Sequence, residues 1–193
     1  MLLGWDESGC LTWSVDAAFA VHNDMKLHTG TTVTMGKGGV ASWSMKQKIT
    51  TRSSTEAELV GVDDASCFIV WTKRFFEHQF KKYPKDGTRS RLIGRTNIVE
   101  QDNTSAIQLE RCGKKSSTKR TRHINIKYFY CTELLEKKMI TAITYKPTKE
   151  LVADYFTKPL QGSLFRKHRN NIMGITEADE AYHAQWYKEH CGN

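Results

Sequence analysis

The sequence predicts an α/β domain built on a five-stranded mixed sheet, in which three antiparallel strands precede two parallel strands and helices cover both faces. Two observations predict this class. Strand patterns fill the first third of the chain, before any helical stripe begins. Strand and helix patterns then alternate, which is typical of a sheet with helices packed on its faces. We expect one domain over residues 1–162 and a partly helical C-terminal tail of unassigned role over residues 163–193.

Three strands are predicted before the first helix. Apolar and polar residues alternate over residues 11–16, the period of a half-buried strand. β-Branched residues favour a second strand over 31–35, and a third is expected over 40–45. The connections, a turn at 28–30 and a glycine-rich break at 36–39, are short, so the strands should form an antiparallel meander.

A long helix is predicted from Ser53 to about Phe80. Ser53 and Glu56 have the spacing of a capping box, which marks a helix start. Five residues then recur at helical spacing and predict one buried face, namely Glu58, Val62, Ala65, Ile69 and Phe76. Residues 81–95 are polar and indicate a loop.

The second half of the chain alternates between strand and helix patterns. Asp102 is placed to open a short helix directly after the fourth strand. Pro147 ends the fifth strand and Pro159 ends the last helix. The predicted elements are a strand over 96–101, a helix over 102–110, a basic connection over 111–122, a helix over 123–138, a strand over 140–146 and a helix over 149–158.

Composition limits the class of protein. The chain has 193 residues, is 39% hydrophobic and carries a formal net charge of +8, which favours a polyanionic partner without proving one. No apolar run has the length of a membrane span, and residues 1–10 lack the regions of a signal peptide, so neither a membrane nor export is expected. The five cysteines form no C-x-x-C pair, which argues against zinc and for reduced thiols in an intracellular protein.

Four carboxylates stand at comparable places and are the candidate metal ligands. Asp16 ends the first predicted strand, Glu58 lies on the buried helical stripe, Asp102 follows the fourth strand, and Asp154 lies in the last predicted helix. Strands one and four should be neighbours, which would bring Asp16 and Asp102 together. Converging carboxylates repel unless a cation neutralises them, and oxygen ligands suit Mg²⁺ or Mn²⁺. Two such ions about 3.5–4 Å apart can hold the attacking and leaving oxygens of a phosphodiester.

Each acid also has a simpler explanation. Asp16 and Asp102 could be turn or capping residues, and Asp154 could lie on a solvated helix face. Glu58 is harder to explain this way, because a carboxylate on the buried stripe needs a partner. Glu56 already has a role in the capping box.

Five blocks of residues resemble the RNase H domains of copia-type retrotransposon polyproteins. In order, they are Val15-Asp16-Ala17, Ser53-Ser54-Thr55-Glu56-Ala57-Glu58-Leu59, Gln101-Asp102-Asn103, Arg122-His123-Ile124-Asn125-Ile126-Lys127-Tyr128 and Ala153-Asp154-Tyr155-Phe156-Thr157-Lys158-Pro159-Leu160. The resemblance implies an RNase H-like fold and a catalytic, metal-binding tetrad of Asp16, Glu58, Asp102 and Asp154. It implies two-metal hydrolysis of the RNA strand of RNA–DNA hybrids, with two Mg²⁺ or Mn²⁺ ions as cofactors.

The resemblance also implies an upstream reverse transcriptase domain in the same polyprotein. The expected location is cytoplasmic, inside a virus-like particle, or nuclear. Many cellular RNases H carry a histidine in the loop before the last acid, and residues 146–150 contain none.

Two basic regions are predicted to contact the phosphates of the hybrid, since backbone contacts dominate affinity for nucleic acids. Shape and 2′-hydroxyl recognition should make sequence preference weak. His123 is interpreted as structural. The predicted substrate-binding residues are Lys46, Gln47, Lys48, Arg52, Asn103, Lys114, Lys115, Lys119, Arg120 and Arg122.

Two other functions remain open at this point. An integrase or transposase core would use Asp16, Asp102 and Glu136, which follows Asp102 at about the spacing of such sites, but it would leave Glu58 and Asp154 without a role. A non-catalytic remnant of a retroelement, which binds nucleic acid or supports a reverse transcriptase, is the second alternative. Metal-dependent cleavage separates these classes.

Overall fold

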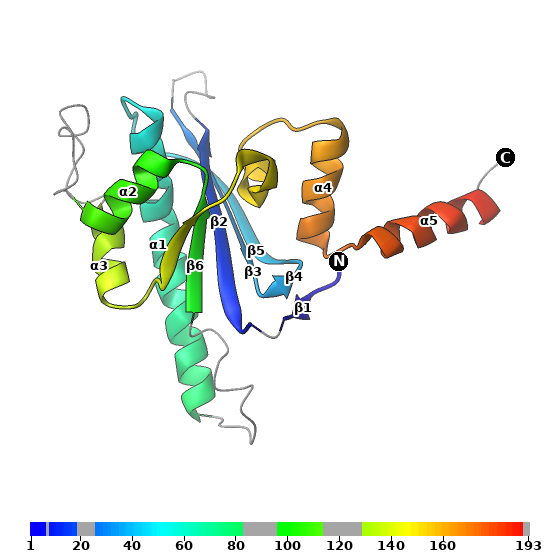
Figure 1. The fold of residues 1–193 in the computed structure, drawn as a ribbon, viewed down its shortest axis with the longest axis horizontal. Coiled ribbons are helices and arrows are strands. Elements are labelled where there is room, and N and C mark those ends of the chain that lie inside the picture. The colour runs from blue at the N-terminus through cyan, green and yellow to red at the C-terminus, as the bar shows by residue number, and fades with distance from the viewer. Residues whose placement is uncertain (7, 19–25, 83–95, 114–128, 191–193) are drawn as a thin grey trace.

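The structure is a computed structural model, which describes residues 1–6, 8–18, 26–82, 96–113 and 129–190. Its centre is a five-stranded sheet with the order β5-β3-β2-β6-β7 (Figure 1). The strands are β2 (Cys10–Ala18), β3 (His28–Thr34), β5 (Gly39–Lys46), β6 (Thr96–Gln101) and β7 (Ala142–Tyr145).

The pairing confirms the predicted mixed sheet. β3 is antiparallel to both β2 and β5, whereas β6 is parallel to both β2 and β7. β2 and β6 are neighbours, which the predicted meeting of Asp16 and Asp102 requires. The residues around the predicted glycine break add a short ribbon that the sequence did not predict, in which β1 (Gly4–Trp5) pairs with β4 (Gly36–Lys37).

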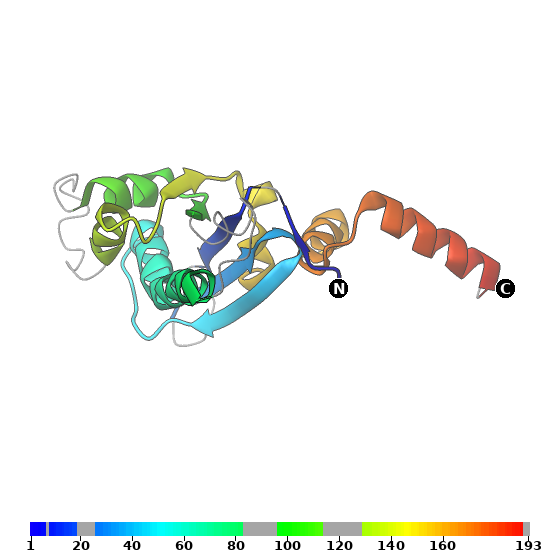
Figure 2. The ribbon, with the colours of Figure 1, turned by 90° about the horizontal axis from the view of Figure 1, so that it is seen from below.

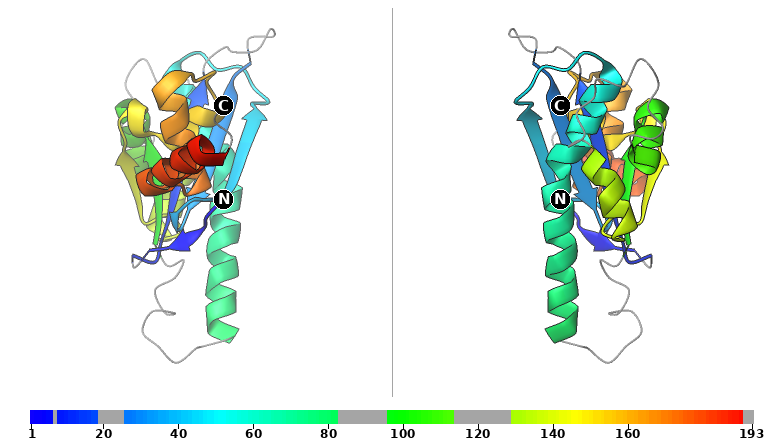
Figure 3. Two further views of the ribbon diagram at one scale, coloured as in Figure 1. Left: turned by 90° about the vertical axis from the view of Figure 1, so that its right-hand side faces the viewer. Right: turned by 90° about the vertical axis from the view of Figure 1, so that its left-hand side faces the viewer.

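Three α-helices cover one face of the sheet, as Figure 3 shows for α1 and its neighbours. They are α1 (Ser54–Lys82), α2 (Thr104–Cys112) and α3 (Tyr130–Glu136). The predicted helical stripe is confirmed, because Val62, Ala65 and Ile69 are fully buried in the main core. Trp13 of β2 lies in the same core, and its Nε1 donates to Asn97 Oδ1 at 2.9 Å.

Two predicted helix starts need correction. Asp102 does not cap α2, because Asn103 is the N-cap and its side chain accepts a hydrogen bond from the Ala106 amide at 3.1 Å. Asp and Asn are equally favoured as N-cap residues, so the sequence alone does not decide which of these two neighbours begins the helix. The helix predicted over 123–138 is observed as α3 from Tyr130, and residues 123–128 lie outside the described part of the chain.

The segment after β7 and α4 cover the opposite face of the sheet (Figure 2). The helix predicted over 149–158 is wrong in type, since this segment forms two 3₁₀ turns, η4 (Thr148–Glu150) and η5 (Val152–Phe156). α4 (Gly162–Met173) packs beside η5 and buries His168, while α5 (Glu177–His190) extends away from the sheet. Helices therefore lie on both faces, as predicted, and the expected helical tail contains α4 and α5.

The domain boundary at residue 162 stays a prediction. α4, which follows it, contacts β5 and η5 rather than standing apart from the domain.

In the described part of the chain no helix is both long and apolar enough to cross a bilayer. The four cysteines that are described, Cys10, Cys67, Cys112 and Cys131, are all free thiols.

Candidate metal centre

Three of the four candidate carboxylates meet at one point. Asp16, Glu58 and Asp102 each offer one carboxylate oxygen, and these oxygens lie within 4.8 Å of one another. Asp16 comes from the end of β2, Asp102 from the end of the adjacent parallel strand β6, and Glu58 from the second turn of α1. The parallel pairing of β2 and β6 is thus the feature that brings the two aspartates together.

The pKa of Glu58 is raised by its surroundings. Its side chain is 5% exposed, and Oε1 accepts a hydrogen bond from the Ala17 amide at 3.3 Å. Burial raises the pKa of Glu58 well above its ordinary value, and the charges of Asp16 and Asp102 raise it further. Its second oxygen, Oε2, is buried and has no hydrogen-bond partner among the described residues. A buried carboxylate oxygen without a donor needs a cation or a proton.

The two aspartates receive hydroxyl hydrogen bonds from outside the sheet. Thr148, in η4, donates to Asp102 Oδ2 at 2.7 Å. Thr157, which follows η5, donates to Asp16 Oδ2. Each hydrogen bond orients its carboxylate through one of the two oxygens.

Asp154 lies beside the three-carboxylate group and is joined to it through Lys158. The Lys158 Nζ is 2.6 Å from Asp154 Oδ1 and 3.5 Å from Asp16 Oδ1. Burial raises the pKa of Asp154 to about 6, with the hydrogen bond from Lys158 opposing the rise and the charge of Asp16 adding to it. Thr157 and Lys158 had no predicted role, although both stand in the sequence block that contains Asp154.

A glycine permits the approach of η5 to the sheet. Gly30 of β3 is paired with Asp16, and a Cβ at Gly30 would lie 2.7 Å from Thr157 Cγ2 and 2.8 Å from the Ala153 carbonyl oxygen. Real Cβ atoms essentially never show such contacts. The segment that carries Asp154 and Lys158 can therefore rest on β3 only because this position has no side chain.

The residues fit a divalent cation. Every donor is a carboxylate oxygen, which Mg²⁺ and Mn²⁺ prefer, and the orphaned Glu58 Oε2 supplies a free ligand atom. The repulsion that raises the pKa of Glu58 is also removed when a cation lies between the carboxylates.

The predicted substrate contacts divide into three groups. Lys46, Lys48 and Arg52 are exposed between the end of β5 and the start of α1, as a phosphate contact requires. Asn103 is half-buried and uses its Oδ1 to cap α2, which leaves its amide nitrogen for other contacts. The predicted basic segment lies outside the described residues, and this applies to Lys114, Lys115, Lys119, Arg120 and Arg122.

Gln47 is the predicted contact that the structure contradicts. Its side chain is 1% exposed, and its Nε2 donates to Thr29 Oγ1 at 2.9 Å and to the Ala57 carbonyl at 3.0 Å. The place of Gln47 before the first helix suggested a contact with the hybrid. Its backbone amide instead donates to the Leu27 carbonyl at 2.8 Å just beyond β5, and its side chain is buried. Gln47 instead ties β3 to the first turn of α1, next to Glu58.

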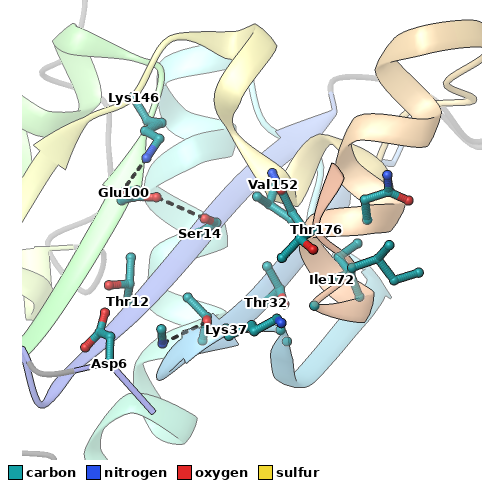
Figure 4. Close-up of a pocket in the computed structure, with 18 residues that line it drawn as sticks. Asp6, Thr12, Ser14, Thr32, Lys37, Glu100, Lys146, Val152, Ile172 and Thr176 are labelled. Carbon is teal, nitrogen blue, oxygen red and sulfur yellow. Dashed lines mark hydrogen bonds and ion pairs between the residues drawn. The ribbon is translucent and has the colours of Figure 1, made fainter. Parts of the chain in front are cut away.

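A polar cavity of about 440 Å³ lies on the sheet face that η5 and α4 cover (Figure 4). Ser14 donates to Glu100 at 3.2 Å and Lys146 donates to the same carboxylate at 3.1 Å, so hydrogen bonds cross from β2 to the loop after β7. Val152 of η5 also lines the cavity. Two of the elements that line the cavity, β2 and η5, therefore also carry Asp16 and Asp154.

Comparison with known proteins relates the chain to a retroelement polyprotein. No protein-family model matches the chain. The chain is 28% identical, over 162 residues, to the retrovirus-related Pol polyprotein from transposon RE1 of Arabidopsis thaliana, and the match covers 83% of this chain. The chain spans about a tenth of the length of that polyprotein, since the match covers 10% of it. This match confirms the resemblance that the sequence motifs indicated.

The solved structures that resemble this chain include RNase H domains. LC11-RNase H1, isolated from compost, has a TM-score of 0.48 and 15% identity, covering 77% of this chain and 93% of that chain. The RNase H domain of prototype foamy virus has a TM-score of 0.46 and 13% identity, covering 93% and 97%. An N-terminal RNase H domain from Mycobacterium tuberculosis has a TM-score of 0.46 and 12% identity, covering 82% and 97%.

Proposed function

We propose that this chain is the ribonuclease H domain of a copia-type retrotransposon polyprotein and that it hydrolyses the RNA strand of RNA–DNA hybrids during reverse transcription. One observation carries the proposal, namely the convergence of Asp16, Glu58 and Asp102 to within 4.8 Å around an orphaned Glu58 oxygen. Asp154 completes the acidic centre through its contact with Lys158. The similarity to the transposon polyprotein supports the same assignment.

The four acids would hold one or two divalent cations, Mg²⁺ or Mn²⁺, which when bound lower the pKa of a water nucleophile and stabilise the charge on the leaving oxygen. The protein's own part is to keep the ligands in place. The Ala17 amide orients Glu58, while hydroxyls from Thr148 and Thr157 orient Asp102 and Asp16. Such orientation matters because ligands that must reorganise during the reaction stabilise its charge less well.

The exposed cations beside α1 would hold the substrate. Lys46, Lys48 and Arg52 lie around the turn that leads into the helix bearing Glu58, so a nucleic-acid backbone bound there would pass close to the acids. We expect the basic residues of segment 114–122 to add phosphate contacts, and we expect a reverse transcriptase domain of the same polyprotein to be the partner. Contacts of this kind carry affinity without sequence preference.

Cleavage of a labelled hybrid tests the proposal. The purified chain should nick the RNA strand, and not the DNA strand, when Mg²⁺ or Mn²⁺ is present. Asp102→Asn should reduce the rate by a factor of about 10³ or more, because it removes a charged ligand and keeps the shape. Glu136→Gln is the matched control: Glu136 is exposed at the end of α3, outside the three-carboxylate group, and its loss should leave the rate unchanged.

The same assay decides between the alternatives. If the chain binds the hybrid and never cuts it with either metal, it is a non-catalytic binding module. Loss of activity in Glu136→Gln together with strand transfer of DNA ends would favour the integrase-like core. If Asp102→Asn cuts the hybrid as fast as the unmodified chain does, the assignment of the metal site is wrong.

A further inference from the structure

Lys158 lies between two of the four candidate ligands. Its Nζ is 2.6 Å from Asp154 Oδ1 and 3.5 Å from Asp16 Oδ1. Both carboxylates are 2% exposed, whereas the Lys158 side chain is 36% exposed, so the ammonium group reaches the buried acids from the solvent side. Asp16 and Asp154 would repel one another, and they share this positive charge instead.

The local backbone delivers Lys158 to this position. Lys158 follows Asp154 by four residues, and its amide donates to the Asp154 carbonyl at 3.0 Å. The preceding residue, Thr157, donates its hydroxyl to Asp16. Two successive side chains thus reach the same aspartate, and the arrangement differs from a surface ion pair between two mobile side chains, which contributes little.

The cations of the described residues are distributed unevenly over the four acids. Lys158 forms ion pairs with both Asp16 and Asp154. In the described part of the chain, no lysine or arginine forms an ion pair with Glu58 or Asp102. Lys158 therefore neutralises Asp16 and Asp154, whereas among the described residues the other two acids of the centre, Glu58 and Asp102, have no such ion pair.

We propose that Lys158 is a built-in counter-cation of the Asp16–Asp154 half of the centre and competes there with a divalent cation. The inference rests on the proposed function and adds an order of loading to it. A first ion binds the Asp16–Glu58–Asp102 group, and a second ion binds the other half only when the Lys158 ammonium withdraws towards solvent. Lys158 is thus a positioning residue that weakens the second binding step.

Titration of the full chain with Mn²⁺ alone, followed by calorimetry and by the electron paramagnetic resonance of free Mn²⁺, tests this. Lys158→Met keeps the length of the side chain and removes its charge. We expect the weaker Mn²⁺ site to bind about tenfold more tightly in this variant, about 1.4 kcal/mol, because a positive charge a few ångströms away is gone. Lys158→Arg keeps the charge and should bind Mn²⁺ as the unmodified chain does.

Lys188→Met is the matched control, since it makes the same charge change at an exposed position of α5. It should leave both Mn²⁺ sites unchanged. A thermal melt of each variant confirms folding, and Lys158→Gln replaces Lys158→Met if the latter does not fold.

The outcomes separate this inference from the function. Weaker or unchanged Mn²⁺ binding in Lys158→Met, with cleavage by the unmodified chain intact, overturns the role of Lys158 and leaves the nuclease standing. Tighter Mn²⁺ binding in a chain that never cleaves hybrids supports the counter-cation and overturns the nuclease. A chain that binds no Mn²⁺ overturns both.

Discussion

The side-chain amide of Gln101, at the end of β6, lies 2.7 Å from the carboxyl oxygen Oε2 of Glu110 on α2. Glu110 is 0% exposed, and burial raises its pKa well above the ordinary value. The Gln101 amide nitrogen donates to this carboxyl oxygen, and the hydrogen bond opposes the rise in the pKa of Glu110 without cancelling it. The hydrogen bond joins the end of β6, next to the candidate ligand Asp102, to the buried side of α2.

Glu110 should therefore make stability depend on pH. Its folded-state pKa exceeds its unfolded value of about 4.5, so the folded chain retains a proton that the unfolded chain loses. The free energy of unfolding should fall as pH rises from about 4.5 towards the folded pKa, by up to about 1.4 kcal/mol per pH unit. Glu110→Gln should remove this slope and be more stable than the unmodified chain at neutral pH, as urea denaturation across pH would show.

The matched control for this measurement is Glu136→Gln, at an exposed carboxylate for which the slope should persist. A Glu110→Gln chain that follows the same pH slope as the unmodified chain would mean that Glu110 is charged when folded.

Gly30→Ala should displace η5. The new methyl group would meet Thr157, the Ala153 carbonyl oxygen and Phe156 at 2.7–2.9 Å, and two of these contacts belong to packed side chains. We expect a loss of about 1–3 kcal/mol in the free energy of unfolding, as for other overpacked sites, together with a loss of hybrid cleavage. Denaturation and the cleavage assay measure the two effects.

Gly61→Ala is the natural comparison, because Gly61 is also buried but its new Cβ would make only ordinary contacts of 3.5–3.6 Å. Within α1 this change should stabilise the chain by up to about 1 kcal/mol. Equal effects of the two substitutions would argue against a specific role of the close packing at Gly30.

Gln47 and Lys48 are adjacent, and their substitution should have opposite consequences. Gln47→Ala leaves buried polar groups of Thr29 and Ala57 without their donor and should cost about 1–3 kcal/mol of stability. Lys48→Ala removes an exposed charge, so it should weaken hybrid binding and lower the salt slope by about one while leaving stability within about 0.5 kcal/mol. Thermal melts and salt-dependent binding curves distinguish the pair. The reverse pattern would restore Gln47 as a substrate contact.

Thr148→Val should reduce hybrid cleavage by about 10–100-fold, which is typical when a hydrogen bond to a ligand is lost. The hydroxyl that donates to Asp102 at 2.7 Å disappears, while the side chain keeps its shape. Rates at saturating Mg²⁺ give the measurement, and Thr72→Val on α1 makes the same change elsewhere. An unaffected rate would show that Asp102 needs no orientation from this loop.

Periodic patterns predicted the sheet and α1 well. The stripe through Val62 and Ile69 reports burial on one helix face, which depends on nearby residues in the sequence. The alternation located β2, but β2 is buried on both faces from Trp13 to Ala18, because α1 covers one face and η5 the other. Because the first and fourth predicted strands are neighbours in a sheet with this order of elements, the meeting of Asp16 and Asp102 could also be predicted.

The secondary structure of the segment after β7 was predicted wrongly for a physical reason. Its residues suit a helix locally, but contact with β3 and the prolines at both ends favour two short 3₁₀ turns. The roles of Thr157 and Lys158 depend on that contact with a distant strand, and no spacing within the segment reveals it. Gln47 was misjudged because its burial likewise depends on where α1 packs.

The glycine at position 30 bears on what would make the proposed nuclease competent. The four acids are its proposed reactive groups, and this chain retains all four. A copy with every acid intact and a single methyl group at Gly30 would still fail to bring Asp154 to Asp16. A substitution at a residue that is not one of the four acids could thus inactivate the chain. A comparison of sequences at the four acids alone would count such a copy as competent.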